Sequence, residues 1–427
     1  MSQELAILQG GESWYERNWR WFVLATLFLA TFLSYFDRQM LGAAMTPIGN
    51  EFKLTNEMKG SLLAAFLWTY AAAHLFVGLI LDRIRNLRWF FPAMVLGWSA
   101  TTVLAGLATT YQQLLLTRYL LGIWESVNFP ICILIIARIF PARERSLASG
   151  IFASGAFLAT LIAPKVVIFF STHSDWRHSF ILAGLLGGAW LAPWFLVFRK
   201  PAERGATCPE PLAANGGAGL ASRPDTILSV LRSPAFWAVA LIGIGIIPSL
   251  YFSTQWLPTC LEKSLNLTYG QKLGNYLLLI YLMQDAGLWI GGGVVLWLAK
   301  RGVTILTARK AVIIAGYLMM VSIVLLTRAQ TAIAYVAVFG CFTFGIGVFL
   351  GNQHAFKQDV VKSHVATVAA WVGFIEMMFT AFVVQRVGVM IGRQSDFAPV
   401  YLVLAGLTTF ALIVVLVLLR PKWLRIE

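Results

Sequence analysis

The stretch Ser34-Tyr35-Phe36-Asp37-Arg38 decides the fold and the function that we expect of this chain. It lies near the end of an apolar run from Trp21 to Ala44, which is long enough to cross a lipid bilayer as a helix. An acid and a base side by side in hydrocarbon are costly, so such residues usually face a bundle interior or a water-filled cavity. The pair therefore predicts a path for a substrate, an ion or a proton. The alternative is a structural ion pair that only holds helices together.

The composition is that of a polytopic membrane protein. Of 427 residues, 59% are hydrophobic and only 12% are charged, whereas soluble domains carry roughly twice that charge. The segment from Met1 to Arg17 is polar and lacks the apolar core of a signal peptide. The basic residues behind the net charge of +14 fall in short loops between apolar runs, so we expect no nucleic acid as a partner. The cysteines are scattered without CxxC spacing and predict neither a disulfide framework nor a metal site: Cys132, Cys208, Cys260 and Cys341.

Twelve apolar runs approach the length that crosses a bilayer, which predicts an all-α protein with twelve transmembrane helices. The first six lie at residues 20–44, 59–81, 89–109, 113–137, 146–170 and 179–198. The second six lie at residues 234–260, 274–298, 309–327, 331–356, 365–391 and 397–419. Basic residues gather in alternate loops, so we expect both termini to lie in the cytoplasm.

A polar segment at residues 199–233 divides the chain into two halves. Its stretch from Glu210 to Pro224 is rich in Ala, Gly and Pro, which predicts a flexible cytoplasmic linker. We therefore expect an N-terminal six-helix bundle at residues 1–198 and a C-terminal six-helix bundle at residues 234–427. Two such bundles are typical of a transporter with its site between them.

The fourth apolar run adds Arg118 and Glu125 to the charges of the first. Seven residues are about two helical turns, so these side chains share one face, roughly 10 Å apart. We expect them to form one buried cluster with Asp37 and Arg38. Two acids and two bases can stay near neutral while protons and an anion exchange places, and an arginine fork suits a substrate carboxylate. Fixed salt bridges between helices are the alternative.

Other polar side chains in the apolar runs are candidates for contacts with substrate hydroxyls. Tyr35 and Tyr70 offer hydroxyl donors, although each could equally serve packing. His74 is more typical of an interior histidine whose hydrogen bonds are satisfied. Gln255 adds an amide, and Pro258 shortly after it predicts a kink in the seventh run.

The second half holds further anomalies. Asp285 and Glu376 lie well inside their apolar runs, and Asn352, Gln353 and His354 follow one another in the tenth. We expect these residues to contribute to substrate binding. Lys357 and Asp359 lie near the cytoplasmic end of the tenth run, where snorkelling side chains are common. A cavity lined by amides, hydroxyls and two arginines suits a sugar acid better than an apolar drug.

The loop between the second and third runs contains Gly78-Leu-Ile-Leu-Asp82-Arg83, followed by Arg85 and Arg88. An acid among bases at a helix end can latch neighbouring helices in one conformation. The simpler interpretation is cytoplasmic positive charge, which Asp82 does not fit.

These stretches resemble the major facilitator superfamily over essentially the whole chain. Gly78 to Arg88 is similar to its loop motif, although Arg85 stands where a glycine is usual, and Arg118-Tyr-Leu-Leu-Gly122 is similar to its fourth-span arginine motif. Three stretches resemble, more narrowly, the anion:cation symporter family: Tyr35-Phe-Asp37-Arg38, Arg118-Tyr-Leu-Leu-Gly-Ile-Trp-Glu125-Ser-Val-Asn-Phe-Pro130 and Phe140-Pro-Ala-Arg143-Glu144-Arg145. Gln284-Asp285-Ala-Gly287 followed by Gly291-Gly-Gly293 is similar to the hexuronate-transporter branch.

The resemblance implies a major facilitator fold that takes up organic anions, mostly sugar acids, together with protons. It implies that Asp37 and Glu125 couple protons, that Arg38 holds the substrate carboxylate and that Arg118 partners the acids. It also supports Tyr35, Tyr70 and Gln255 as pocket residues. A conformational latch is expected from Asp82, Arg83, Arg143 and Arg145. A monomer in a bacterial inner membrane, driven by a proton gradient and without a cofactor, is likewise implied.

The second half departs from the family pattern, which leaves the substrate open. Trp297 stands where the loop motif between the eighth and ninth spans usually has an acid, and Gly373 where an asparagine is common. His354 falls where a pocket tryptophan is common, and Glu376 replaces a small residue.

We therefore expect a proton-coupled importer of an organic anion, most simply a hexuronate or an aldonate. An exporter of neutral or amphipathic compounds on the same fold and a solute sensor that does not transport remain alternatives. We expect no enzyme, because the chain carries no Ser/His/Asp set, HExxH, CxxC or phosphate-binding loop that would support one.

Overall fold

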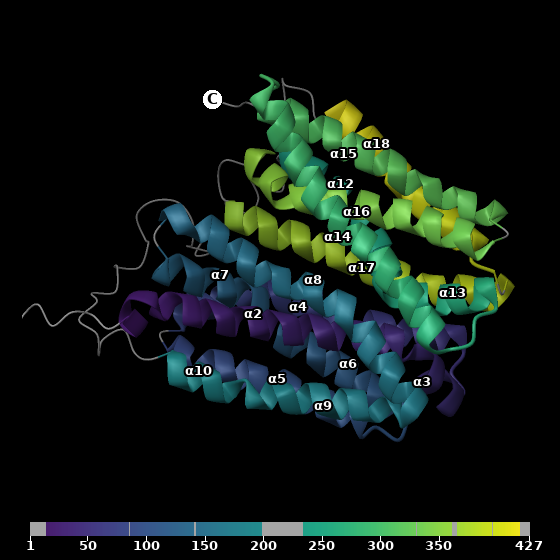
Figure 1. Cartoon of the computed structure of the whole chain (residues 1–427), viewed down its shortest axis with the longest axis horizontal. Helices are drawn as coiled ribbons and strands as arrows, with labels where there is room; N and C mark the ends of the chain where they lie inside the picture. The colour runs from purple at the N-terminus through teal and green to yellow at the C-terminus, as the bar shows by residue number, and fades with distance from the viewer. Residues whose placement is uncertain are drawn as a thin grey trace, which may run out of the picture.

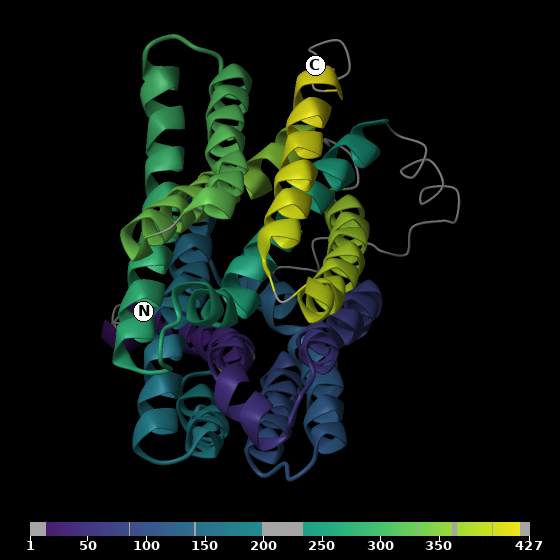
Figure 2. The same ribbon diagram turned by 90° about the vertical axis from the view of Figure 1, so that its right-hand side faces the viewer.

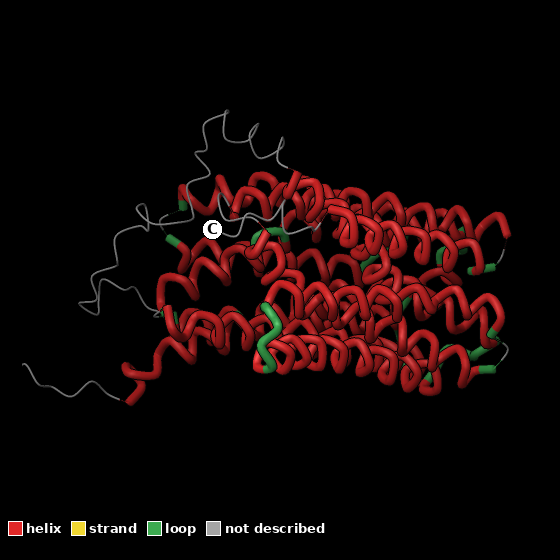
Figure 3. Tube along the Cα trace, turned by 90° about the horizontal axis from the view of Figure 1, so that it is seen from above, coloured by secondary structure: helices red, strands yellow, loops and turns green. Residues whose placement is uncertain are grey.

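The computed structural model describes residues 14–84, 86–140, 142–198, 234–329, 331–360, 365–394 and 396–418. Throughout these residues the chain forms helices joined by short connections, and no strand occurs among them (Figure 3). Twelve segments in this part of the chain are long and apolar enough to cross a membrane. The expected all-α membrane protein is thereby confirmed. The expected linker, residues 199–233, lies outside the described residues.

The described part of the first half contains nine helices, because three of its six spans are extended or interrupted by a short break. They are α2 (Trp14–Ala43), α3 (Met45–Glu51), α4 (Asn56–Arg83), α5 (Leu87–Gly106), α6 (Tyr111–Glu125), α7 (Asn128–Ile139), α8 (Ala142–His173), α9 (Trp176–Ala189) and α10 (Leu191–Val197). The second half contains α12 (Pro234–Tyr251), η2 (Phe252–Trp256), α13 (Leu257–Leu265), α14 (Gln271–Lys300), α15 (Ile305–Val321), η3 (Ser322–Arg328), α16 (Ala332–Val360), α17 (Val365–Gln394) and α18 (Ala398–Leu418).

Side-chain caps define where several spans begin. The Thr55 hydroxyl accepts a hydrogen bond from the Met58 amide at the start of α4, and Thr110 does the same for Gln113 at the start of α6. The Asp175 carboxylate accepts from the Arg177 amide at the start of α9. Such caps satisfy amides that the helix itself leaves without a partner.

In the fourth and seventh spans a proline accounts for a local departure from regular α-helix. The run expected at residues 113–137 divides between α6 and α7, directly before Asn128. Pro130 has no N–H for the carbonyl of Ser126, four residues earlier, so the helical bond between them cannot form. In the seventh span, Pro258 follows η2, a π-helical turn, so the expected kink takes the form of a local widening of the helix.

The two halves form separate bundles that lie side by side, the first purple to blue and the second green to yellow (Figures 1 and 2). Between them, α4 packs against α17 and α8 packs against α14. Within the first half, α2 packs against α8; within the second, α14 packs against α16. This is the arrangement of two six-helix bundles that the sequence predicts.

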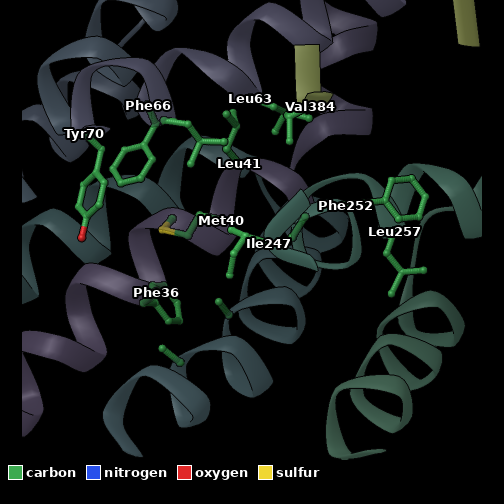
Figure 4. Packing of buried hydrophobic residues seen from close by; sticks show 14 of the residues in the cluster. Phe36, Met40, Leu41, Leu63, Phe66, Tyr70, Ile247, Phe252, Leu257 and Val384 are labelled. Carbon is green, nitrogen blue, oxygen red and sulfur yellow. The ribbon is translucent and has the colours of Figure 1, made fainter. Parts of the chain in front are cut away.

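One apolar core connects the bundles. Figure 4 shows Phe36 and Met40 of α2 and Phe66 of α4 in the same cluster as Ile247 of α12 and Val384 of α17. All five side chains are buried. The halves are therefore in apolar contact near the middle of the molecule.

Hydrogen bonds between the halves gather at the end remote from the two described chain ends. Four such bonds are found among the described residues: Thr46 Oγ1 to Glu262 Oε2 at 2.6 Å, Tyr269 Oη to the Ala43 carbonyl at 2.8 Å, Gln385 Nε2 to Ser61 Oγ at 3.4 Å and Lys263 Nζ to Asn56 Oδ1 at 3.5 Å. Glycines allow the backbones to meet there. A Cβ on Gly60 would lie 2.7 Å from the carbonyl oxygen of Gln385. We call this the closed end of the molecule.

Candidate functional site

Glu125 is the centre of a hydrogen-bonded group at the end of α6. Its Oε2 accepts 2.9 Å from the Ser34 hydroxyl and 2.6 Å from Arg38 Nε, both on α2. Ser34 and Arg38 are four residues apart and therefore lie on one face of their helix. Glu125 is fully buried and the Arg38 side chain is only 7% exposed. A carboxylate and a guanidinium are thus paired directly in the interior.

Aromatic rings surround the guanidinium of Arg38. Its Cζ lies 4.5 Å from the ring centre of Tyr35, 4.7 Å from that of Tyr70 and 5.0 Å from that of Phe66. Such cation–π contacts are stronger where water is excluded. Both predicted tyrosines therefore border the predicted anion-binding arginine. The described residues bond Nε and Nη2 of Arg38 and give Nη1 no partner.

Asp37 lies on the same helix and interacts with a separate partner on α5. Its Oδ2 accepts 2.9 Å from the Thr102 hydroxyl, and its side chain is buried. Its Oδ1 has no hydrogen-bond partner among the described residues. Asp37 is close enough to Glu125, Arg118 and Arg38 for electrostatic interaction with all three. The four charges predicted to form a cluster therefore do lie together.

Arg118 plays a different part from Arg38 in this group. Its guanidinium lies 5.4 Å from the ring centre of Phe180 on α9, and its Nε has no hydrogen-bond partner among the described residues. It interacts electrostatically with Asp37 and Glu125. Arg38 thus makes the direct ion pair with an acid, and Arg118 interacts with both acids without a hydrogen bond to either among the described residues.

The break after Glu125 lies against α4. The ring of His74 comes close to the backbone of Ser126, the residue at which Pro130 interrupts the helical ladder. His74 also stacks on Tyr70, with ring centres 5.3 Å apart. The Nδ1 of His74 has no hydrogen-bond partner among the described residues, so the expectation of an interior histidine with satisfied hydrogen bonds is wrong, and the ring lies next to the charge cluster.

From the second half, η2 brings Gln255 to the first bundle. The Gln255 side chain is buried, and its Oε1 has no hydrogen-bond partner among the described residues. A Cβ on Gly42 of α2 would lie 3.0 Å from the Gln255 backbone, so the two chains touch. An amide oxygen without a partner at this junction is available to a ligand donor.

Tyr251, the last residue of α12, is a site residue that the sequence reasoning missed. It is close enough to Arg38, Tyr35, Tyr70 and Glu125 for electrostatic interaction. Tyr251 therefore brings a residue of the second half near the ion pair of Arg38 and Glu125. Its position directly before η2, four residues from Gln255, is the signal that could have identified it. Ser34 and Thr102 were also missed, because a hydroxyl in an apolar helix gives no distinctive pattern.

The remaining predicted residues of the second half have other described neighbours. Asn352 is buried and donates 2.9 Å to the Val348 carbonyl of its own helix. The buried carboxyl group of Glu376 lies directly against Gly243 of α12, where even a Cβ would overlap it. Asp285 is half-buried on α14. It is three helical turns from Gly274, and on the same face; Gly274 approaches Lys165 of the first half.

Several predicted side chains lie outside the part of the structure that is described. They are Gln353 and His354 on α16, and the expected latch residues Asp82, Arg83, Arg143 and Arg145. The conformational contact that the structure does describe lies at the closed end.

Two six-helix bundles with a buried cluster of acids and bases define the class of this protein as a membrane transporter, because ionisable residues are kept inside a membrane for transport. Residues 27–384 match the model of the Major Facilitator Superfamily, and the chain belongs to that family.

Relatives with established names transport sugar acids. The D-galactonate transporter of Escherichia coli O6:H1 is 28% identical over 312 residues, which cover 70% of this chain and 72% of the relative. The hexuronate transporter of Escherichia coli (strain K12) is 24% identical over 417 residues, 94% of each chain. Among solved structures, a bacterial homologue of the human lysosomal transporter Spinster, inward-facing and occupied, has a TM-score of 0.69 at 18% identity. It covers 93% of this chain and 96% of its own, and at that identity the likeness shows the fold.

Proposed function

We propose that this protein imports a monocarboxylate sugar acid, such as a hexuronate or an aldonate, together with protons. The observation that carries the proposal is the buried ion pair of Arg38 and Glu125, with its 2.6 Å hydrogen bond. Removing one partner of a buried pair leaves the other uncompensated, which is strongly unfavourable. Arg38 therefore needs one anion at a time, either Glu125 or the substrate.

This exchange links proton binding to substrate binding. A proton on Glu125 removes the charge that holds Arg38, and the guanidinium can then pair with a substrate carboxylate through two parallel N–H groups. Loss of the proton restores the internal pair and displaces the substrate. Asp37, which interacts with the same charges from its bond to Thr102, is the second proton-coupling group in this proposal.

Hydroxyl and amide groups around Arg38 suit the rest of a sugar acid. Tyr35 and Tyr70 lie beside the guanidinium on the first half. From the second half, Tyr251 lies close enough to Arg38 for electrostatic interaction, and Gln255 lies against Gly42, one helical turn after Arg38 on α2. A ligand that spans these groups contacts both bundles, so its binding can bias how the bundles sit against each other. The substrates for which these relatives are named, D-galactonate and hexuronate, have this combination of one carboxylate and several hydroxyls.

For orientation, we propose an inner (plasma) membrane location with both termini in the cytoplasm, as the basic loops indicate. The closed end then faces outward, and this conformation is closed to the outside. We further propose that the monomer is the transporting unit, that a rocking motion of the halves alternates access, and that the proton gradient takes the place of any cofactor.

The test is uptake of radiolabelled hexuronate and aldonate into proteoliposomes, with and without an inward proton gradient. We expect accumulation only with the gradient, and loss of accumulation in Arg38→Ala. Arg301→Gln is the matched control, because Arg301 stacks on Trp297 at 3.8 Å, on α14 and away from the cluster, and it should transport normally. Accumulation that is indifferent to the gradient would refute proton coupling. No uptake of either acid, with transport of a neutral compound instead, would refute the substrate class.

A further inference from the structure

An apolar groove runs between α17 and α18 on the outer surface of the second bundle. It extends on α17 from Phe379 to Met390 and on α18 from Val400 to Leu407. Every side chain that lines it is apolar, except that of Arg386. Its empty volume is about 500 Å³, including the open space at its mouth. A single water occupies about 30 Å³ of liquid, so the groove has room for a chain-like ligand.

Arg386 faces away from the rest of the protein. Its neighbours in sequence, Gln385 and Gly388, contact Ser61 and Asn56 of the first bundle, which places Arg386 on the opposite side of α17. The side chain is exposed, and its guanidinium lies 5.1 Å from the ring centre of Phe382. The described residues provide no carboxylate for it. An arginine on a membrane-facing surface is unfavourable unless an anion or water compensates its charge.

The depth of Arg386 matches the boundary of the hydrocarbon. It lies two residues, or about 3 Å, from the level of Gly388, which touches Asn56 at the first residue of α4. The polar residues Glu57 and Lys59 follow Asn56 at the same end. A phosphate group of the adjoining leaflet is therefore within reach of a long arginine side chain.

The length of the groove matches that of a lipid acyl chain within one leaflet. From Arg386 to Phe379 the groove continues for seven residues, or about 10 Å of helix. One leaflet contributes about 15 Å to the hydrocarbon core. An acyl chain that starts at the level of Arg386 would therefore lie in the groove for about two thirds of its leaflet.

We propose that this groove binds an anionic phospholipid at the closed end of the molecule, with its phosphate paired to Arg386 and one acyl chain along α17 and α18. The charge of Arg386 selects the headgroup, and the apolar walls select a chain over a free anion. The site is separate from the Arg38 cluster and does not depend on the transport proposal.

The experiment compares phosphatidylglycerol with phosphatidylcholine of the same acyl chains, using native mass spectrometry and thermal unfolding in detergent. We expect the wild type to retain phosphatidylglycerol preferentially and to unfold at a higher temperature with it. In Arg386→Gln the preference should fall by about tenfold, which corresponds to about 1.4 kcal/mol of binding free energy. Arg301→Gln is the matched control, since Arg301 also stacks on an aromatic ring four residues earlier but lies outside the groove.

A second variant tests the groove itself. Val403 lines it and is 41% exposed, so Val403→Trp fills the space while Arg386 stays. We expect this variant to lose phosphatidylglycerol as well, and glycerol phosphate without acyl chains to give no stabilisation. Equal retention of both lipids by the wild type, or an unchanged preference in Arg386→Gln, would overturn the proposal. A dimer that both variants dissociate would assign the groove to a second copy of the chain instead.

Discussion

Arg38 on α2 donates a hydrogen bond of 2.6 Å to Glu125, the last residue of α6. The same carboxylate oxygen accepts from Ser34, one turn before Arg38. The charge state of Glu125 and the availability of Arg38 are therefore determined together. From this pair and from the contacts at the closed end we derive five predictions.

Glu125→Gln should uncouple transport from the proton gradient. Glutamine keeps the size of the side chain and can still accept from Arg38, but it cannot carry or release a charge. We expect gradient-driven accumulation to fall to the level reached without a gradient, while exchange of labelled for unlabelled substrate continues. Glu57→Gln, at an exposed residue of α4, should leave both unchanged. Accumulation at the wild-type level would show that Glu125 is not a coupling acid.

Tyr251→Phe should weaken substrate binding without destroying transport. Removing one hydroxyl costs the net free energy of a hydrogen bond, about 0.5–1.5 kcal/mol. We expect KM to rise about three- to tenfold, with little change in the maximal rate. Tyr276→Phe on α14 is the control, because Tyr276 packs against the apolar core. An unchanged KM would remove Tyr251 from the binding site.

Thr46→Val should destabilise the closed end. The variant removes the 2.6 Å bond to Glu262, which joins α3 to α13 across the halves. A hydrogen bond to a charged group is worth about 1.5–3 kcal/mol, so we expect the ratio of open to closed molecules to rise at least tenfold. Spin labels at the exposed residues Glu57 and Thr268 should report a longer distance. Thr172→Val, whose hydroxyl bonds only within its own helix, should leave that distance unchanged.

Gly388→Ala should also raise the ratio of open to closed molecules, in this case through packing. A Cβ there would overlap the Asn56 carbonyl and lie 3.0 Å from Gly60 Cα, and backbone atoms cannot move aside as a side chain can. Overpacking costs about 1–3 kcal/mol, which favours separated halves by roughly 5- to 150-fold. Gly392→Ala, one turn further along, is the control, because its nearest neighbour is Asn56 Cβ at 3.8 Å. If both variants give the wild-type label distance, the glycine contact does not limit opening.

Glu51 should make stability depend on pH at the closed end. Its carboxylate accepts 2.8 Å and 2.6 Å from the two terminal nitrogens of Arg177 and 2.8 Å from the Trp176 indole. The bond with Arg177, supported by the indole, lowers the pKa of Glu51 below its usual value near 4.5. A lowered folded-state pKa means stabilisation that is present above the unfolded pKa and lost as the pH falls through the folded pKa.

The corresponding variant is Glu51→Gln. Because the pair is partly exposed, we expect a loss of only about 0.5–1 kcal/mol at neutral pH. Thermal unfolding should show this difference from the wild type at pH 7, and the difference should shrink as the pH falls below the usual pKa of a glutamate and disappear below the lowered pKa of folded Glu51. The stability difference between the wild type and Glu57→Gln should not change with pH in this way. If the difference in thermal stability between the wild type and Glu51→Gln persists at low pH, the ion pair with Arg177 is not its cause.

The fold could be predicted because long apolar runs and the short loops between them leave few alternatives. The grouping of Asp37, Arg38, Arg118 and Glu125 could also be predicted, because a buried charge is unfavourable without a partner. Which arginine bonds which acid could not be predicted, since it depends on how α2 and α6 are rotated about their axes. Helical spacing gives the face of one helix but not its register against another.

Residues that act across the two halves were the hardest to predict. Tyr251 was missed although it stands four residues before Gln255, because one tyrosine in an apolar run is by itself no sign of a site. Lys165 was missed because one lysine in an apolar run gives no pattern. It lies against Gly274 of the opposite half. The contacts of the closed end, such as Thr46 with Glu262, join segments more than 200 residues apart.

The approach of His74 to the backbone of Ser126 connects α4 to the break that follows Glu125. Helix α4 carries His74, and the same helix packs along α17 of the other bundle. A shift of α4 against α17 therefore acts on the peptide next to Glu125. Thermodynamic reciprocity requires the converse, because two coupled equilibria change each other by the same factor. If Glu125 takes up a proton as we propose, the proton concentration is an effector in its own right, and it should set the balance of open and closed molecules even when no substrate is bound.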